Sequence, residues 1–184
     1  MGRPKNFSRD GVLEKAIPVF WERGFADTSL QDLESATGVN KSGLYAEFKG
    51  KEDLFLESLR YYVASRPAKE ILAAKPLGLS NVEKFLTIGY SCWDGQRGCF
   101  SVNSMREFAV LPPEAHEIVA DSLMQIKRLL IKNIQAEGTK TDPAGIAEVV
   151  MTFFSGICIE QNLKGSKGST NRKIESLMQM IRQL

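Results

Sequence analysis

The sequence lacks most features that mark secreted, membrane or metal-dependent proteins. It contains three cysteines and one histidine in 184 residues. Three cysteines are an odd number for a disulfide framework, and His116 has no cysteine or histidine beside it at ligand spacing. No uninterrupted apolar run approaches the ~18 residues that span a bilayer, and no apolar stretch follows the N-terminus as in a signal peptide. We therefore expect a cytoplasmic protein with no membrane segment, no metal and no cofactor.

An excess of one charge is also missing. The formal net charge is +2, and the first 66 residues contain ten basic and ten acidic side chains. Total charge therefore gives no indication of nucleic-acid binding, which depends on where the basic side chains lie. The chain also has no glycine-rich phosphate loop after a strand and no nucleophile elbow. Because these motifs are missing and only one histidine is present, an enzyme is not expected.

What the sequence does have is helical periodicity throughout. No segment alternates apolar and polar side chains for long enough to predict a sheet, so the predicted fold class is all-α. Ser8 is a candidate cap for a first helix that ends at Gly24, and Pro18 within it should kink the helix or remove a backbone hydrogen bond. Further helices are predicted at 51–66, 81–93, 102–109, 113–136, 142–163 and 170–183.

Two short helices joined by a glycine-containing turn lie within the first fifty residues. Thr28 is interpreted as the cap of the first, with Gln31 completing a capping box, and Gly38 ends this helix. Asn40 then caps a second short helix at 41–48. This arrangement predicts a helix-turn-helix, whose second helix enters the major groove of DNA and presents its N-terminal residues to base edges.

The start of that second helix and its surroundings carry groups that bind bases and phosphates. Asn, Lys and Ser side chains exchange hydrogen bonds with base edges, and N–H groups at helix starts bind phosphate. Each residue also has a purely structural interpretation, as a cap, a packed aromatic or a solvated lysine, and a basic tail is either a solvated end or a minor-groove arm. The candidate DNA-binding residues are Thr28, Asn40, Lys41, Ser42, Gly43, Tyr45, Lys49, Lys51, Arg3 and Lys5.

This region resembles the N-terminal domain of the tetracycline-repressor (TetR) family over roughly residues 10–59. The matching residues are Gly24-Phe25, Thr28-Ser29-Leu30, Leu33, Ala36-Thr37-Gly38-Val39, Lys41, Gly43-Leu44-Tyr45, Phe48, Lys51-Glu52 and Leu54. The resemblance implies a homodimer that represses transcription and releases double-stranded DNA when a small molecule binds its C-terminal domain. It also implies DNA contacts by Thr28, Lys41, Ser42, Tyr45 and Lys51. Glu47 departs from the family, which often has histidine or another neutral or basic group there.

The remainder of the chain is expected to form the dimer. We assign 1–50 to an N-terminal three-helix DNA-binding domain, 51–66 to a connecting helix, and 67–184 to a larger helical ligand-binding and dimerisation domain. Two apolar stripes with helical spacing are core in a monomer or an intersubunit four-helix bundle in a dimer, and a two-fold dimer predicts a near-palindromic operator. The candidate interface residues are Ile146, Val150, Phe153, Ile157, Ile174, Leu177, Met178 and Ile181.

Aromatic and Met side chains in the same region are candidates for the wall of a ligand pocket, although such residues also form ordinary cores. They favour an apolar or aromatic inducer, which Asn103 or Glu107 would orient. The candidate pocket residues are Phe85, Ile88, Trp93, Phe100, Asn103, Met105, Glu107, Phe108, Met124 and Phe154. Cys92 and Cys99 are candidate sensor thiols, because Arg97 lies close to Cys99 in sequence. A thiol- or metal-responsive regulator, or a DNA-binding factor without a ligand, is the alternative interpretation.

Overall fold

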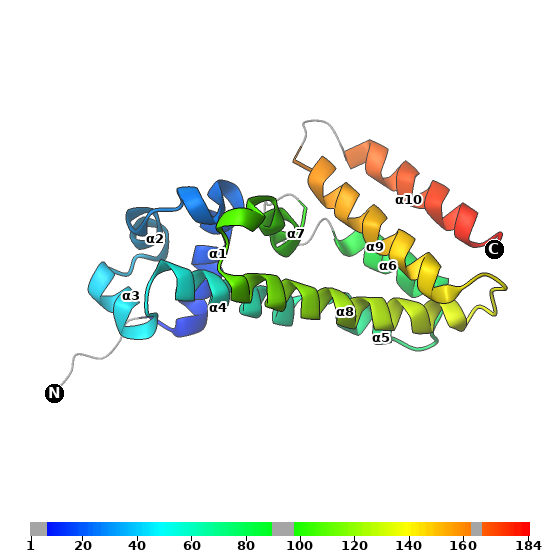
Figure 1. The fold of residues 1–184 in the computed structure, drawn as a ribbon, viewed down its shortest axis with the longest axis horizontal. Helices are drawn as coiled ribbons and strands as arrows, with labels where there is room; N and C mark the ends of the chain where they lie inside the picture. Colours follow the sequence, from blue (N-terminus) through cyan, green and yellow to red (C-terminus); the bar gives the residue numbers. More distant parts are fainter. Residues whose placement is uncertain (1–6, 90–97, 163–166) are drawn as a thin grey trace. The chain divides into compact units, whose positions relative to one another are not determined.

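The computed structural model describes residues 7–89, 98–162 and 167–184 (Figure 1). The regular elements in these ranges are all helices, and the predicted all-α fold is confirmed. The chain forms two compact units, a first unit of residues 1–65 and 104–119 and a second unit of residues 66–103 and 120–184. The predicted domain bounds of 1–50, 51–66 and 67–184 stay a prediction beside this division. The sequence does not predict that residues 104–119 join the first unit.

The first unit is built around its first helix. This helix packs against α2 (Leu30–Thr37), α4 (Lys51–Ser65) and the 3-10 helix η1 (Met105–Val110). Phe20 and Phe55 meet edge to face with ring centroids 5.1 Å apart, and Trp21 meets Tyr62 in the same way at 5.3 Å. Aromatic pairs of this kind stabilise a core beyond the area they bury. The helices are α1 (Arg9–Asp27), α2 (Leu30–Thr37), α3 (Lys41–Glu47) and α4 (Lys51–Ser65).

Helix α1 begins and ends with the predicted signals. The Ser8 hydroxyl accepts a hydrogen bond from the Gly11 N–H at 3.0 Å, and the helical run breaks at Gly24, whose φ is 83° and ψ is 173°. The dihedrals of α1 stay helical through Pro18 and leave the helical range only at Gly24, so the helical run does not break at Pro18. Proline removes one backbone hydrogen bond, but its fixed φ is helical and the chain here continues through it.

The cap of α2 lies one residue later than predicted. Ser29, not Thr28, is the N-cap, and its hydroxyl accepts from the Asp32 N–H at 3.1 Å. The Asp32 carboxylate accepts from the Ser29 N–H at 2.9 Å, so Asp32 replaces Gln31 in the capping box. The neighbouring Thr and Ser have similar capping chemistry, which explains why the sequence alone misplaces the start by one residue.

The second unit contains a short helix that the sequence does not predict, α5 (Ala68–Ala73). The helix predicted at 102–109 is instead divided between α7 (Phe100–Ser104) and η1, where Glu107 leaves helical dihedrals with φ −102° and ψ 25°. Helix α8 begins in the first unit and continues into the second. The other helices are α6 (Leu79–Gly89), α8 (Pro113–Gln135), α9 (Pro143–Glu160) and α10 (Lys167–Ile181).

A buried amide organises part of the second unit. Asn133 is fully buried, and its Nδ2 donates to the Leu72 and Leu129 carbonyls at 2.7 and 2.9 Å. Its Oδ1 accepts from the Gly78 N–H at 3.0 Å and from Asn81 Nδ2 at 2.9 Å. All four hydrogen-bonding positions of the amide are thereby used, which removes the cost of burying it.

The two apolar stripes predicted for the dimer are mainly core within this chain. Of the eight residues, only Phe153 is not buried; the others are at most 6% exposed. This corrects their assignment to an interface, because side chains covered by their own chain cannot also cover a partner. Ile146, Val150, Ile157, Ile174, Leu177, Met178 and Ile181 are the residues concerned.

Helix α9 is long and apolar enough to cross a membrane by length and composition alone, with a mean hydropathy of 1.4 over 18 residues. Its apolar run is interrupted by Glu148. A core helix has the same composition, and the burial of Val150, Phe154 and Ile157 within the chain accounts for part of the apolar character of α9.

Candidate nucleic-acid interface

The turn between α2 and α3 is fixed by local hydrogen bonds. Gly38 adopts the left-handed conformation, with φ 73°, and its N–H donates to the Glu34 carbonyl at 2.9 Å. Asn40 follows as the N-cap of α3, and its Oδ1 accepts from the Gly43 N–H at 2.9 Å. Both features agree with the prediction. Glycine ends one helix and asparagine starts the next within three residues, which is the tight turn a helix-turn-helix needs.

Helix α3 has one buried face and one exposed face. Leu44 and Phe48 are 1% and 2% exposed, whereas Lys41, Ser42 and Tyr45 lie on the solvent side. Lys41 Nζ lies 5.6 Å from the centroid of the Tyr45 ring, which is 48% exposed. The predicted polar and aromatic residues therefore share the outward face of α3, while the apolar face with Leu44 and Phe48 packs against the protein.

Gly43 has a structural reason to be glycine. A Cβ at this position would lie 2.7 Å from Val39 Cγ1 and 3.3 Å from Asn40 Oδ1. Any side chain would push against the cap of α3. Packing within the protein therefore already requires glycine here, whether or not DNA approaches the backbone closely. Contact between Gly43 and DNA stays a prediction.

Among the described candidates, Thr28 has the least accessible side chain. It is 1% exposed, and its hydroxyl donates to the Gly24 carbonyl at 2.5 Å. A direct contact of this hydroxyl with DNA is therefore not supported, which corrects the prediction. Lys49 is exposed, and its N–H donates to Asp53 at 2.9 Å. Arg3 and Lys5 lie outside the described residues.

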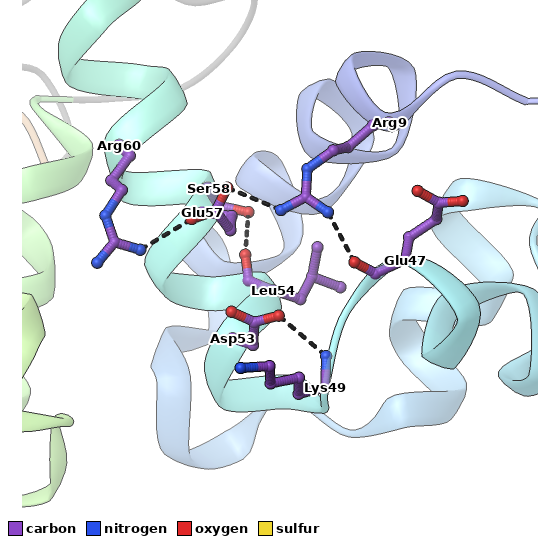
Figure 2. A network of polar contacts seen from close by, with 8 residues as sticks. All are labelled: Arg9, Glu47, Lys49, Asp53, Leu54, Glu57, Ser58 and Arg60. Atoms are coloured by element: carbon purple, nitrogen blue, oxygen red, sulfur yellow. Dashed lines mark hydrogen bonds and ion pairs between the residues drawn. The ribbon is translucent and has the colours of Figure 1, made fainter.

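Arg9 connects the C-terminal end of α3 to α1 and α4 (Figure 2). Its guanidinium donates to the Glu47 carbonyl at 2.6 Å and to the Glu57 carboxylate at 2.8 Å. The same group lies 4.4 Å from the centroid of the Phe48 ring. A cation beside the last carbonyls of a helix is favourable, so Arg9 fixes the end of α3 opposite to the one predicted to meet bases.

This network also affects the charge of Glu57. Hydrogen bonding from Arg9 lowers the pKa of the Glu57 carboxyl below its ordinary value of 4.5, and Arg60, at 2.8 Å, acts in the same direction. Figure 2 shows that the side-chain carboxylate of Glu47 points away from the Arg9 guanidinium, which its backbone carbonyl contacts. Glu47 therefore contributes to this network through its backbone.

Acidic residues that sequence reasoning missed also hold the motif. Glu34, on α2, accepts a short hydrogen bond from the Lys41 N–H at the first turn of α3. Glu57 and Arg9 are 48 residues apart, so no local spacing indicates their pairing. The sequence gives one indication of this role: Arg9 lies in the first turn of α1, where the helix dipole gives a basic residue no benefit.

Several candidate pocket residues lie where they cannot line a pocket. Phe108 and Met124 are 62% and 50% exposed, and the Phe108 ring stacks on His116 with centroids 4.0 Å apart. Glu107 accepts hydrogen bonds from the Phe25 and Ala26 N–H groups of the first unit. These three assignments are corrected accordingly.

The other candidates are buried or lie outside the described residues. Phe85 and Phe154 pack on each other with ring centroids 4.8 Å apart, while Phe100 and Asn103 are also buried and Met105 is half-buried. A groove of about 380 Å³ in the second unit is lined by none of the described candidate pocket residues; its wall includes Leu79, Ile134, Lys140 and Arg182. Trp93 and the side chain of Ile88 are not among the described residues.

One of the two candidate sensor thiols can be located. Cys99 is 8% exposed, and its sulfur lies 3.1 Å from the Ser101 hydroxyl. Cys92 lies outside the described residues. Across the described ranges, no group of three or more His, Cys, Asp or Glu side chains is arranged to hold a metal ion.

The described geometry defines a helix-turn-helix protein. A model of the bacterial regulatory proteins of the tetR family matches residues 12–58. The HTH-type transcriptional repressor ComR of Escherichia coli is 37% identical over 123 residues, which are 64% of this chain and 57% of ComR. The repressor BdcR of the same bacterium is 30% identical over 122 residues, covering 64% of this chain and 60% of BdcR. The chain therefore matches somewhat more than half the length of these relatives.

Solved structures match nearly the whole fold. Reduced NemR of Escherichia coli has a TM-score of 0.77 at 17% identity, covering 96% of this chain and 95% of NemR. A cysteine mutant of CifR, a TetR-family regulator bound to 26-base-pair operator DNA, has a TM-score of 0.79 at 24% identity and covers 97% and 98%. Residues 12–58 are therefore similar to the bacterial regulatory proteins of the tetR family, and the described fold is that of solved TetR-family regulators.

Proposed function

We propose that this protein is a sequence-specific DNA-binding repressor of transcription that leaves its operator when a small molecule binds the second unit. The observation that carries the proposal is the exposed face of α3, which presents Lys41, Ser42 and Tyr45 at the helix-turn-helix while Leu44 and Phe48 hold the opposite face. We expect the protein to act in the cytoplasm, and we assign it no enzymatic activity.

The exposed residues divide by chemistry. Lys41 and Ser42, at the start of α3, are suited to base edges, as is any part of Asn40 not used in capping. Tyr45 and Lys49 are suited to phosphate, because a phenol and an ammonium donate to phosphate oxygens without reading sequence. Lys51 is also a candidate for phosphate, although its ammonium donates to two backbone carbonyls in the protein itself.

The proposed regulator is a homodimer. The outer face of α9 carries Val149 and Ile159, which are 56% and 48% exposed, together with exposed Thr152 and Gly156 between them. These positions share one helix face, and the small residues allow a close approach of a second helix. A two-fold dimer would place two recognition helices one DNA turn apart and predicts a near-palindromic operator.

For the inducer, the buried aromatic residues of the second unit favour an apolar or aromatic molecule. Phe85, Phe100 and Phe154 would form the wall, and Asn103 would orient a polar group of the ligand.

Selection from a random-sequence duplex library tests DNA recognition directly. The wild-type protein should enrich a near-palindrome, and Lys41→Ala should lose preference at one or two base pairs per half-site, at a cost of about 1–3 kcal/mol each. Lys84→Ala, an exposed lysine on α6, is the control and should select the wild-type sequence. Failure of the wild type to enrich any sequence at low salt would refute the proposed function.

A further inference from the structure

The segment just before the helix-turn-helix is held between two opposite charges. The Phe25 and Ala26 N–H groups donate to the two carboxylate oxygens of Glu107 at 2.6 and 3.1 Å. The carbonyls of the same two residues accept from the ammonium of Lys51 at 2.8 and 3.2 Å. We call this arrangement the Glu107–Lys51 bracket; all of its residues belong to the first unit.

The bracket supplies hydrogen bonds that the backbone cannot supply here. Helical dihedrals stop at Gly24, so the N–H groups that follow resemble those of a new helix start, which require acceptors from outside the helix. Two consecutive N–H groups match the two oxygens of one carboxylate. On the other side, the Lys51 ammonium also lies 4.6 Å from the centroid of the Phe25 ring.

Gly24 is required by the same arrangement. Its φ of +83° is disfavoured for residues with a side chain. A Cβ on Gly24 would also lie 2.5 Å from Glu107 Oε2, so the carboxylate occupies the space that a side chain would need. Glycine at position 24 therefore provides both the backbone conformation of this turn and the space that the Glu107 carboxylate occupies.

The bracket controls where α2 begins. Thr28 is buried, and its hydroxyl binds the Gly24 carbonyl, so residues 24–28 form one tightly held turn. Helix α2 starts two residues later, at Leu30, and is followed through the Gly38 turn by α3. A shift of this turn would consequently shift the helix-turn-helix as a whole.

We propose that Glu107 is a positioning residue for operator binding: through the bracket it holds the helix-turn-helix in the orientation that both recognition helices need. This rests on the proposed function. Glu107 lies on η1, four residues after Asn103, where the chain leaves the second unit. The residue that orients the DNA-binding motif is thus placed on the segment that connects the two units.

The test compares Glu107→Gln with Glu117→Gln, an exposed glutamate of α8 in the same unit. Both changes remove one negative charge, so general attraction to DNA changes equally. Binding is measured on the duplex selected by the wild type and on alternating poly(dI-dC). Amide exchange of Phe25 and Ala26 is followed by NMR in the absence of DNA.

In Glu107→Gln, the glutamine amide can accept at only one of the two N–H groups. We expect exchange at Phe25 and Ala26 to accelerate at least about tenfold and the ratio of specific to non-specific affinity to fall about tenfold, with Glu117→Gln unchanged in both. Partial unfolding would lower both affinities together and would accelerate exchange throughout the first unit, and either result overturns the proposal. The proposal is also overturned if Glu107→Gln shows the same exchange at Phe25 and Ala26 and the same affinity ratio as the wild type. If the wild type selects no operator, the proposed function fails, and the role of Glu107 in operator binding fails with it. Accelerated exchange in Glu107→Gln would still establish the bracket.

Discussion

Replacing Arg9 with Gln tests how the C-terminal end of the recognition helix is supported. A charged donor on a carbonyl is worth about 1.5–3 kcal/mol, an exposed ion pair about 0.2–1 kcal/mol, and an exposed cation–π contact about 0.5–1 kcal/mol. These contributions are not additive when one group makes all three contacts. Because 40% of the Arg9 side chain is exposed, we expect a loss of about 1.5–2 kcal/mol in the free energy of unfolding.

The assay is urea unfolding followed by circular dichroism at neutral pH, with Arg60→Gln as the matched control. Arg60 makes an ion pair with the same Glu57 at 2.8 Å, but it is three residues away on the same helix and 47% exposed. Such pairs contribute about 0.5 kcal/mol or less. Equal losses in the two variants would mean that the Glu47 carbonyl and Phe48 ring contacts contribute nothing, and would refute the reasoning.

Acid titration gives an independent result for the same variant. The pKa of Glu57 is lowered in the folded protein by Arg9, so its stabilisation is complete above its unfolded pKa and is lost as pH falls through the folded value. The Arg9→Gln protein lacks the main cause of that shift. The difference in stability between wild type and variant should therefore shrink as the pH falls below the ordinary carboxyl pKa of 4.5. A difference that is constant over this range would contradict the assigned ion pair.

Two further substitutions test the proposed contacts with DNA and with a second copy of the chain. Lys51→Ala should weaken binding to all sequences and lower the slope of log affinity against log salt by about one, with Lys84→Ala as control; an unchanged slope would leave Lys51 only its role in the bracket. Val149→Glu should raise the dimer dissociation constant at least about tenfold in sedimentation equilibrium, because a charge would enter an apolar contact. Val110→Glu, at a site of nearly equal exposure (55%) on η1, should leave the dissociation constant unchanged, and the opposite pattern would move the interface away from α9.

The helices of the first unit could be predicted because their signals are local. Ser8, Gly38 and Asn40 each act within four residues of their own position, and apolar spacing identifies the buried Leu44 and Phe48. The errors are also local: Thr28 and Ser29 have nearly equal capping chemistry, so the start of α2 is misplaced by one residue. At Pro18, where the sequence predicts a kink or the loss of a backbone hydrogen bond, the dihedrals of α1 remain helical.

The supports of the motif could not be predicted, because they join distant parts of the chain. Arg9 reaches residues 38 and 48 positions away, and Glu107 reaches Phe25 over 82 positions. No periodicity records such pairings. For the same reason, the apolar stripes of α9 and α10 do not reveal which residues are covered by their own chain, and seven of the eight proposed interface residues are core.

The acidic residues explain how a domain without net positive charge can present a DNA-binding face. Asp32 accepts from Ser29 at the start of α2, Glu34 accepts from the Lys41 N–H, and Glu57 binds Arg9. Glu107 likewise accepts from the Phe25 and Ala26 N–H groups in the bracket. These carboxylates are engaged with groups of the first unit, whereas Lys41 and Lys49 are exposed at the two ends of α3. A neutral sum therefore combines acidic side chains that orient the motif with basic ones that face outward, and it is their placement, not their number, that suits the motif to phosphate and bases.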